Sequence, residues 1–157
     1  MTSSALPGRP PKDLDKTYLE GNLGFCVRQV QLALFNNFFE RLAKLDLRPA
    51  EFSILCLIAD NPGCRASDIA EVLAIKRPNF VPLLAGLELR NVVVRQQSET
   101  DRRSHELFLT PEGRAVTKKA KMLVDQQEAF IAAHLGDEKR AELLKTLRQM
   151  ERIDYNL

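Results

Sequence analysis

The sequence has 157 residues, 45% of them hydrophobic and 28% charged, which is the length and composition of one globular domain. With no Trp and two Tyr, it lacks the aromatic side chains on which single-stranded nucleic acids stack. Its longest apolar run, at 52–59, is too short to span a bilayer, and residues 1–16 contain no apolar signal core. We therefore expect a cytoplasmic protein that does not use a membrane as a partner.

The net charge of +2 is unevenly distributed along the chain. Residues 1–73 contain 8 Lys/Arg and 9 Asp/Glu, and residues 104–157 contain 9 of each. Residues 74–103 contain 6 Lys/Arg and only 3 acidic residues, so the whole positive excess lies there. A local excess of this kind is typical of a surface that binds a polyanion, although an ordinary solvated face can carry the same charge.

The cysteines and histidines form no recognisable catalytic or metal-binding motif. The cysteines are odd in number and include no C-x-x-C pair, and no histidine lies at metal-ligand spacing from them. They are Cys26, Cys56 and Cys64. His105 and His134 accompany no nucleophile elbow, phosphate-binding loop or pair of carboxylates. We therefore expect reduced thiols, no metal, no cofactor and no catalytic site, and hence no enzyme.

The N-terminal part of the chain predicts an arm followed by two helices. Residues 1–15 are polar and contain three prolines, which indicates a flexible arm. Apolar residues recur with a helical period over 16–45, a length that suggests a helix that also meets a partner. Pro49 marks the start of a buried helix at 49–59, which the turn sequence DNPGC ends.

The next segment has the pattern of a helix-turn-helix followed by a hairpin. A short helix is predicted at 66–75, and a second one at 76–91 opens with Lys-Arg and has Pro78 in its first turn. Apolar strands follow at 92–96 and 105–109, separated by a charged tip. This order predicts a winged helix-turn-helix.

Two more helices complete the chain. Thr110 is the predicted N-cap of a long helix over 111–135, which Gly136 ends. Asp137 is the predicted cap of a last helix that reaches 153. The fold class is therefore mainly α with a small β wing.

The basic residues of this segment suit double-stranded DNA. A helix that presents Lys76, Arg77 and Asn79 in its first turn fits the major groove, where Asn and Arg form bidentate pairs with base edges. The hairpin beside it carries Arg95 on a strand and can lie along the DNA backbone. Its charged tip can then reach the minor groove, which attracts inserted arginine.

The hairpin tip contains Asp101, Arg102 and Arg103. A carboxylate two positions from a guanidinium can hold it in one orientation, so that less entropy is lost on contact. A solvated turn remains the alternative, because Ser, Thr, Asp and Glu favour turns in any case.

The segment LELRNVVVRQQSETDRRSHELFLTPEG, residues 87–113, carries a family resemblance. It is similar to the wing region of MarR-type transcriptional regulators, and the resemblance extends over about 16–153. Asp101-Arg102-Arg103 occupies the Asp-x-Arg position of the wing tip, and residues 109–113 occupy the entry into the long helix. The resemblance implies that Arg103 enters the minor groove and that Asp101 orients it.

Three residues depart from the family pattern. Pro78 and Pro82 stand in the recognition helix where members usually carry Ser, Thr or a basic or polar residue. Pro82 removes a backbone donor, can kink the helix, and offers a base only an apolar contact, such as one to a thymine methyl. Asn91 replaces a common Gly, a mild change because Asn tolerates left-handed geometry.

The resemblance also implies a symmetric assembly. Residues 16–153 would form one MarR-like domain, with a DNA-binding lobe at about 49–110. Helices at about 16–45 and 111–153 would form a homodimer. Such a dimer reads a pseudo-palindromic operator, most simply as a repressor that blocks access to the promoter.

Regulators of this type commonly respond to small aromatic acids, and some respond to acyl-CoA thioesters. The candidate ligand-binding residues here are Phe25, Arg28, Phe38 and Phe39, within the apolar stretch 24–42. The alternative for the phenylalanines is the core, and the alternative for Arg28 is an ordinary ion pair.

Two alternative functions stay open at this point. One is a redox-sensing repressor that uses Cys26, although this residue lies two positions beyond the place of the sensing thiol in peroxide-responsive relatives. The other is a winged helix that binds protein instead of DNA.

Overall fold

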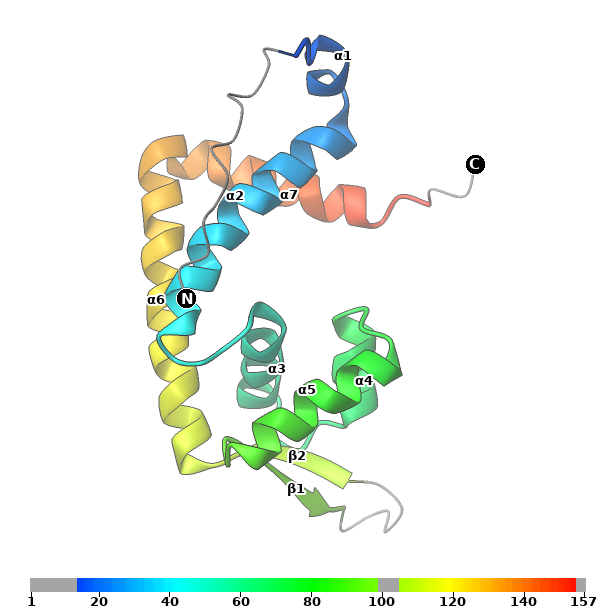
Figure 1. Cartoon of the computed structure of the whole chain (residues 1–157), viewed down its shortest axis with the longest axis vertical. Coiled ribbons are helices and arrows are strands. Elements are labelled where there is room, and N and C mark those ends of the chain that lie inside the picture. The colour runs from blue at the N-terminus through cyan, green and yellow to red at the C-terminus, as the bar shows by residue number, and fades with distance from the viewer. Residues whose placement is uncertain (1–13, 99–104, 155–157) are drawn as a thin grey trace, which may run out of the picture. The chain divides into compact units, whose positions relative to one another are not determined.

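The computed structural model describes residues 14–98 and 105–154 of the chain (Figure 1). The chain divides into two compact units, Met1–Asn37 and Phe38–Leu157. The second unit combines several helices with a two-stranded antiparallel sheet. The predicted fold class, mainly α with a small β wing, is therefore confirmed.

From residue 14 onward, where the structure describes it, the first unit contains two helices in place of one long one. Helices α1 (Thr17–Glu20) and α2 (Leu23–Ala43) replace the single helix predicted at 16–45, and α2 continues into the second unit. The side chain of Asn22 accepts a hydrogen bond from the Phe25 amide at 3.3 Å. A short polar side chain in this position caps a helix start. The prediction of one continuous helix is wrong because the chain caps a new helix here.

The second unit contains a lobe built from three short helices. They are α3 (Pro49–Asp60), α4 (Ala66–Val72) and α5 (Arg77–Leu89). Their apolar side chains form one buried cluster with those of the hairpin, and each fully buried Leu or Ile stabilises the fold by roughly 1.5–3 kcal/mol. The most deeply buried members are Leu42, Ile54, Leu55, Ile58, Leu84, Leu87 and Leu107.

Helix α3 begins where the sequence predicts. Pro49 is its first residue, and the side chain of Glu51 accepts a hydrogen bond from the Arg48 amide at 2.8 Å. This bond reaches back across the helix start, as the glutamate of a capping box does.

Helix α4 is shorter than the predicted 66–75. Ala74 adopts a left-handed φ of 50°, and the amide of Ile75 donates to the carbonyl of Ala70 at 2.9 Å. This geometry closes the C-terminus of a helix, usually with glycine in the left-handed position. No glycine stands at this position in the sequence, so the apolar pattern alone predicted a longer helix.

Helix α5 runs without interruption from Arg77 to Leu89 although Pro82 lies inside it. Pro82 has no amide hydrogen, so the carbonyl of Pro78 lacks its usual helical donor. The proline therefore changes the hydrogen bonding of this helix without ending it.

The end of α5 leads directly into the hairpin. Asn91 has a φ of 55°, and the amide of Val92 donates to the carbonyl of Leu87 at 3.1 Å. The predicted left-handed residue at the C-terminus of this helix is confirmed. The turn redirects the chain into the first strand within two residues.

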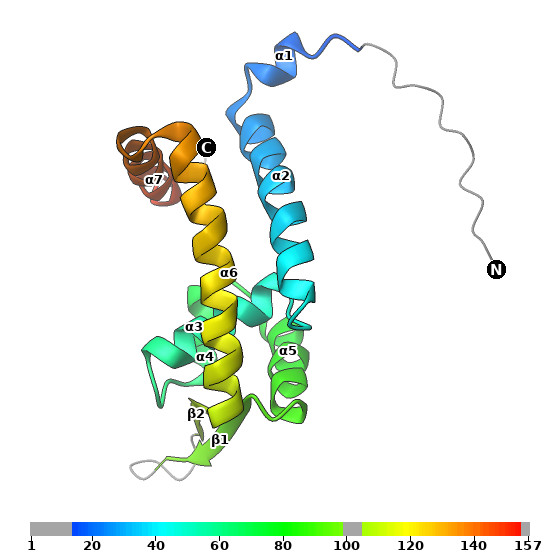
Figure 2. The same ribbon diagram turned by 90° about the vertical axis from the view of Figure 1, so that its left-hand side faces the viewer.

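The hairpin consists of β1 (Val93–Gln97) and β2 (His105–Leu109), paired so that Arg95 lies opposite Leu107. Strand β2 is also bonded to the loop after α3, because the Leu107 amide donates to the carbonyl of Cys64 at 3.0 Å. The hairpin extends from one end of the lobe, beside the C-terminal end of α5 (Figures 1 and 2).

Helix α6 (Pro111–Leu135) has the predicted boundaries, and Thr110 is its N-cap. The hydroxyl of Thr110 accepts from the Gly113 amide at 2.9 Å and donates to the carbonyl of Asn91 at 2.7 Å. A Cβ atom added to Gly113 would lie 1.9 Å from the carbonyl oxygen of Val92. The first turn of α6 therefore packs on the chain between α5 and β1 at a distance that only glycine allows.

Helix α7 (Asp137–Glu151) follows α6 after Gly136, which has a φ of 80°. Gly136 is the N-cap of α7 and Asp137 is its first helical residue, so the predicted cap is one residue too late. In the described ranges, no helix combines the length and apolarity that crossing a membrane requires.

Candidate nucleic-acid interface

The N-terminal turn of α5 presents a cluster of polar and basic side chains. Lys76 is the N-cap residue, and Lys76, Arg77 and Asn79 are all exposed. The N-terminus of a helix carries a partial positive charge, which adds to the two cationic side chains. The structure thus places these three predicted DNA-binding residues together on the surface.

Arg95 of β1 is held by Glu88 of α5. Its Nε atom lies 2.7 Å from Oε1 of Glu88, and its Nη2 atom donates to Oε2 at 3.0 Å. This bidentate pair joins the hairpin to α5 at a partly exposed edge of the helix. The pair could not be predicted from the sequence, because the two residues lie on different elements and have no helical spacing.

A pocket of about 620 Å³ lies between α4 and α5. Its lining is largely apolar, with Phe80, Val81 and Leu84 from α5, and it includes both Arg77 and Arg95. Two of the arginines predicted to contact DNA, Arg77 and Arg95, therefore border the same pocket, although one comes from a helix and the other from a strand.

The predicted wing tip cannot be placed. Asp101, Arg102 and Arg103 lie outside the described residues, and so does the predicted orientation of Arg103 by Asp101. The strands that carry the tip are described up to Ser98 and from His105.

Arg90 belongs to the basic segment but has a structural role. Its Nη1 atom lies 3.6 Å from Oε2 of Glu51, its Nε atom lies 3.8 Å from Oδ2 of Asp46, and Nη2 donates to the carbonyl of Leu45 at 3.5 Å. These contacts join the end of α5 to the start of α3. Part of the positive excess seen in the sequence is therefore neutralised inside the lobe.

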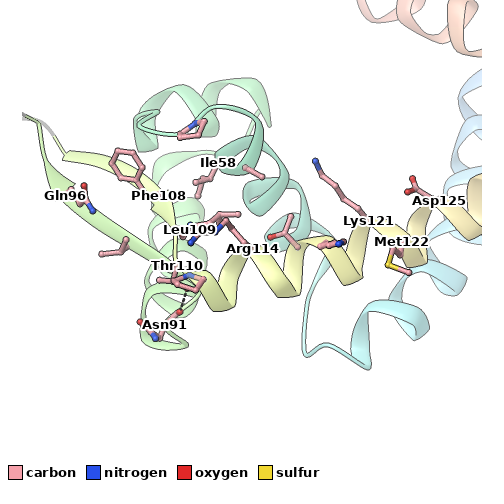
Figure 3. Close-up of a pocket in the computed structure, with 16 residues that line it drawn as sticks. Ile58, Asn91, Gln96, Phe108, Leu109, Thr110, Arg114, Lys121, Met122 and Asp125 are labelled. Atoms are coloured by element: carbon pink, nitrogen blue, oxygen red, sulfur yellow. Dashed lines mark hydrogen bonds between the residues drawn. The ribbon is translucent and has the colours of Figure 1, made fainter.

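A second feature of the lobe is a groove of about 790 Å³ that follows α6 (Figure 3). The hairpin contributes Gln96 and Phe108 to its lining, and the end of α3 contributes Ile58. Met122 and three cations, Arg114, Lys118 and Lys121, come from α6. This groove could not be predicted from the sequence, because folding brings its residues together from three separate segments.

Two of the three cations along the groove have partners. Arg114 donates to the carbonyl of Leu109 at 2.8 Å, and Nζ of Lys121 lies 2.9 Å from Oδ1 of Asp60. The hydrogen bond to Asp60 raises the pKa of the Lys121 ammonium and so further favours its charged form. An apolar floor beside fixed cations is a suitable surface for an anionic amphiphile.

The comparison with known proteins identifies the family. A sequence profile of the MarR family matches residues 47–105. A putative transcriptional regulatory protein for the hcr operon of Thauera aromatica is 31% identical over 137 residues, which cover 87% of this chain and 82% of that protein. The chain belongs to the MarR family.

Solved structures of another MarR-family protein are similar over most of the chain. The transcriptional repressor CouR bound to a 23-mer DNA duplex is 41% identical, with a TM-score of 0.85, and the match covers 89% of this chain and 99% of CouR. CouR bound to p-coumaroyl-CoA is 39% identical, with a TM-score of 0.82, and the match covers 90% and 100% of the two chains. The relatives are regulators, so this MarR-family chain is a DNA-binding transcriptional regulator and not an enzyme.

The predicted effector residues of this MarR-family protein fall in both units. Phe25 and Arg28 belong to the first unit, where Phe25 is half-buried and Arg28 is exposed. Phe38 and Phe39 belong to the second unit. Phe38 packs edge-to-face on Phe52 of α3, with ring centroids 5.6 Å apart, so it contributes to the lobe core.

Phe39 has a different environment from its neighbour in sequence. Its side chain is 51% exposed and lines a pocket of about 880 Å³. That pocket also includes Arg48, Asn79 and Arg90, and therefore borders the N-terminal end of α5. The role of all four predicted residues in ligand binding stays a prediction.

The three cysteines of this MarR-family protein differ in exposure. Burial raises the pKa of the half-buried thiols of Cys56 and Cys64, which lowers their thiolate fraction and their reactivity. Cys26 is exposed, and its Sγ donates to the carbonyl of Glu20 at 3.3 Å. In the described ranges, no group of three His, Cys, Asp or Glu residues gathers closely enough to hold a metal ion.

Proposed function

We propose that this protein is a dimeric repressor that binds a pseudo-palindromic operator and leaves it when a small aromatic acid or its acyl-CoA thioester binds. The observation that carries the DNA-binding part is the exposed turn of Lys76, Arg77 and Asn79 beside a hairpin. The 41% identity to a repressor solved on duplex DNA supports the same assignment.

In this proposal, the turn of α5 enters the major groove and the hairpin tip enters the minor groove. Lys76, Arg77 and Asn79 contact bases or adjacent phosphates. Arg95 contacts the backbone through the part of its guanidinium that Glu88 leaves free. Arg102 and Arg103 act at the tip, where Asp101 orients Arg103.

The proposed homodimer would cover apolar surface that one chain leaves open. Several large apolar side chains are exposed on α2, on the second half of α6 and on α7. Surfaces of this kind usually mark a protein–protein contact. They include Leu23, Val27, Val30, Leu34, Phe130, Leu135, Leu143, Leu144 and Leu147.

The purified protein is expected to have twice the 17.8 kDa mass of one chain in light scattering coupled to size exclusion. Leu147→Glu should shift it toward a monomer, because a carboxylate would have to be buried in the contact. Val72→Glu on α4, where the side chain is also exposed, is the matched control and should leave the mass unchanged. A wild-type mass of one chain would contradict the dimer.

The effector part of the proposal is supported by the similarity to CouR, which was solved with p-coumaroyl-CoA. Phe25, Phe38 and Phe39 supply aromatic surface near one another in sequence, and Arg28 supplies a charge for a carboxylate or phosphate. The groove in Figure 3 is a second candidate site for the effector, because it also combines apolar surface with cations.

Binding of p-coumaroyl-CoA is expected to lower the affinity for the operator, as measured by fluorescence anisotropy of a labelled duplex. Arg28→Ala should raise the effector concentration for half-release about tenfold, because a charge-assisted hydrogen bond is lost. Lys118→Glu tests whether the groove along α6 binds the effector. Lys119→Glu is its control, because Lys119 lies on the same helix but does not line the groove. Unchanged release in Arg28→Ala would remove this residue from the effector site.

A further inference from the structure

The outward face of α5 carries no side chain that can form a hydrogen bond. Phe80, Leu84 and Leu87 are buried, and helical periodicity places residues 78, 82, 85 and 89 on the opposite side. These four are Pro78, Pro82, Ala85 and Leu89, and all are exposed. Leu89 is 92% exposed, although burying an apolar side chain of this size is strongly favourable.

The polar residues of α5 lie at its N-terminal turn and along its edges. Arg77 and Asn79 belong to the first turn, and Glu88 is engaged by Arg95. The middle of the outward face can therefore offer a base edge only van der Waals contact.

Gly86 makes this face more open still. A Cβ atom added there would meet nothing within 4 Å, so packing within the described part of the chain does not require glycine. Glycine in a helix interior is unfavourable compared with alanine. Its position next to Pro82 on the helix surface leaves room for close approach by a bulky partner.

We propose that α5 recognises thymine by its methyl groups, with Pro82 at the centre of the contact and with Pro78, Ala85 and Leu89 around it. The thymine C5-methyl is the apolar group that the major groove displays. This inference rests on the proposed DNA-binding role of α5. It predicts that the operator contains A·T pairs where the middle of the helix lies, whereas Arg77 and Asn79 set the bases at its N-terminal end.

Charge distinguishes DNA from a protein as the occupant of this face. Lys76 and Arg77 stand at one end of the apolar face, and Arg95 stands beside it. A phosphate backbone on both sides of a groove complements this arrangement of cations around an apolar strip. Rigid proline rings also lose little entropy when they are held against a base.

The test begins with operators selected from a random duplex library by the full-length wild-type protein. Deoxyuridine then replaces thymidine at single positions, which removes the methyl group and keeps every hydrogen-bonding group of the base. Replacing one contacted thymine is expected to lower the affinity about fourfold. Replacing the equivalent thymine in both half-sites is expected to lower it about fifteenfold. Replacement outside the half-sites is the control and should have no effect.

Pro82→Ala tests the protein side of the contact. Alanine removes the ring methylenes and restores a backbone donor, so the helix is expected to remain folded. At one operator position, replacement of thymine by uracil should lower the affinity of the wild-type protein. The same replacement should not change the affinity of the variant. Pro62→Ala, at an exposed proline outside α5, should keep the wild-type discrimination.

The outcomes separate this inference from the proposal on which it rests. If the library yields no preferred duplex, the proposed operator binding itself fails. If operators are selected but uracil replaces thymine without loss, methyl recognition is overturned, and the apolar face serves another partner. Equal weakening of thymine and uracil operators by Pro82→Ala would also overturn it, because that result indicates a purely structural role for the proline.

Discussion

Gly113→Ala is expected to destabilise the protein by about 3 kcal/mol or more, because the new methyl group has no space. Its Cβ atom would lie 1.9 Å from the carbonyl oxygen of Val92 and 2.8 Å from the carbonyl carbon. Both neighbours are backbone atoms, in the segment that joins α5 to β1. They cannot rotate away as a flexible side chain would.

The loss should appear as a lower midpoint of urea unfolding with an unchanged slope, followed by circular dichroism. Gly86→Ala is the matched control, since a Cβ atom there meets nothing within 4 Å. That variant should be more stable than the wild type by about 0.5–1 kcal/mol, because alanine favours a helix interior. A wild-type unfolding midpoint for Gly113→Ala would show that the start of α6 can move away from Val92.

Raising the salt concentration from about 50 to about 200 mM is expected to weaken operator binding by a factor on the order of 10³ or more. Each neutralised phosphate releases counterions, and a dimer would present every cation of α5 and the hairpin twice. The logarithm of the association constant should fall linearly with the logarithm of the salt concentration. Binding that is insensitive to salt in this range would contradict the phosphate contacts.

Arg77→Ala relates this salt dependence to one residue. If Arg77 contacts a phosphate in each half-site, its loss should lower the magnitude of the salt slope by about 2 for the dimer. Lys119→Ala changes the same charge at an exposed position of α6 and should leave the slope unchanged. If both variants gave the same slope, the effect would come from net charge and not from a contact.

The pair of Arg95 with Glu88 shows why charge in a sequence does not translate directly into a binding surface. Arg90 and Arg95 both belong to the basic segment, yet each has carboxylate partners within the lobe. Lys76 and Arg77 are the exposed basic residues at the helix start. Ion pairs at a partly exposed surface contribute only about 0–1 kcal/mol each to the free energy of unfolding. The main effect of these pairs is therefore to position the arginine side chains.

The sequence by itself determined the features that depend on neighbouring residues. Pro49, Thr110 and Gly136 set helix boundaries through local backbone chemistry, and the structure has these boundaries where they were predicted. The apolar residues on either side of the charged tip also located both strands to within one residue. The wing motif in residues 87–113 then identified the family, which the comparisons confirm.

Only the tertiary structure decided which side chains meet across segments. The groove along α6, the role of Arg90 and the separate environments of Phe38 and Phe39 all depend on contacts between residues far apart in sequence. The requirement for Gly113 has the same origin, since Val92 lies against it only after the hairpin has turned the chain back. Local propensity contains no information on such contacts, because packing of the whole lobe determines them.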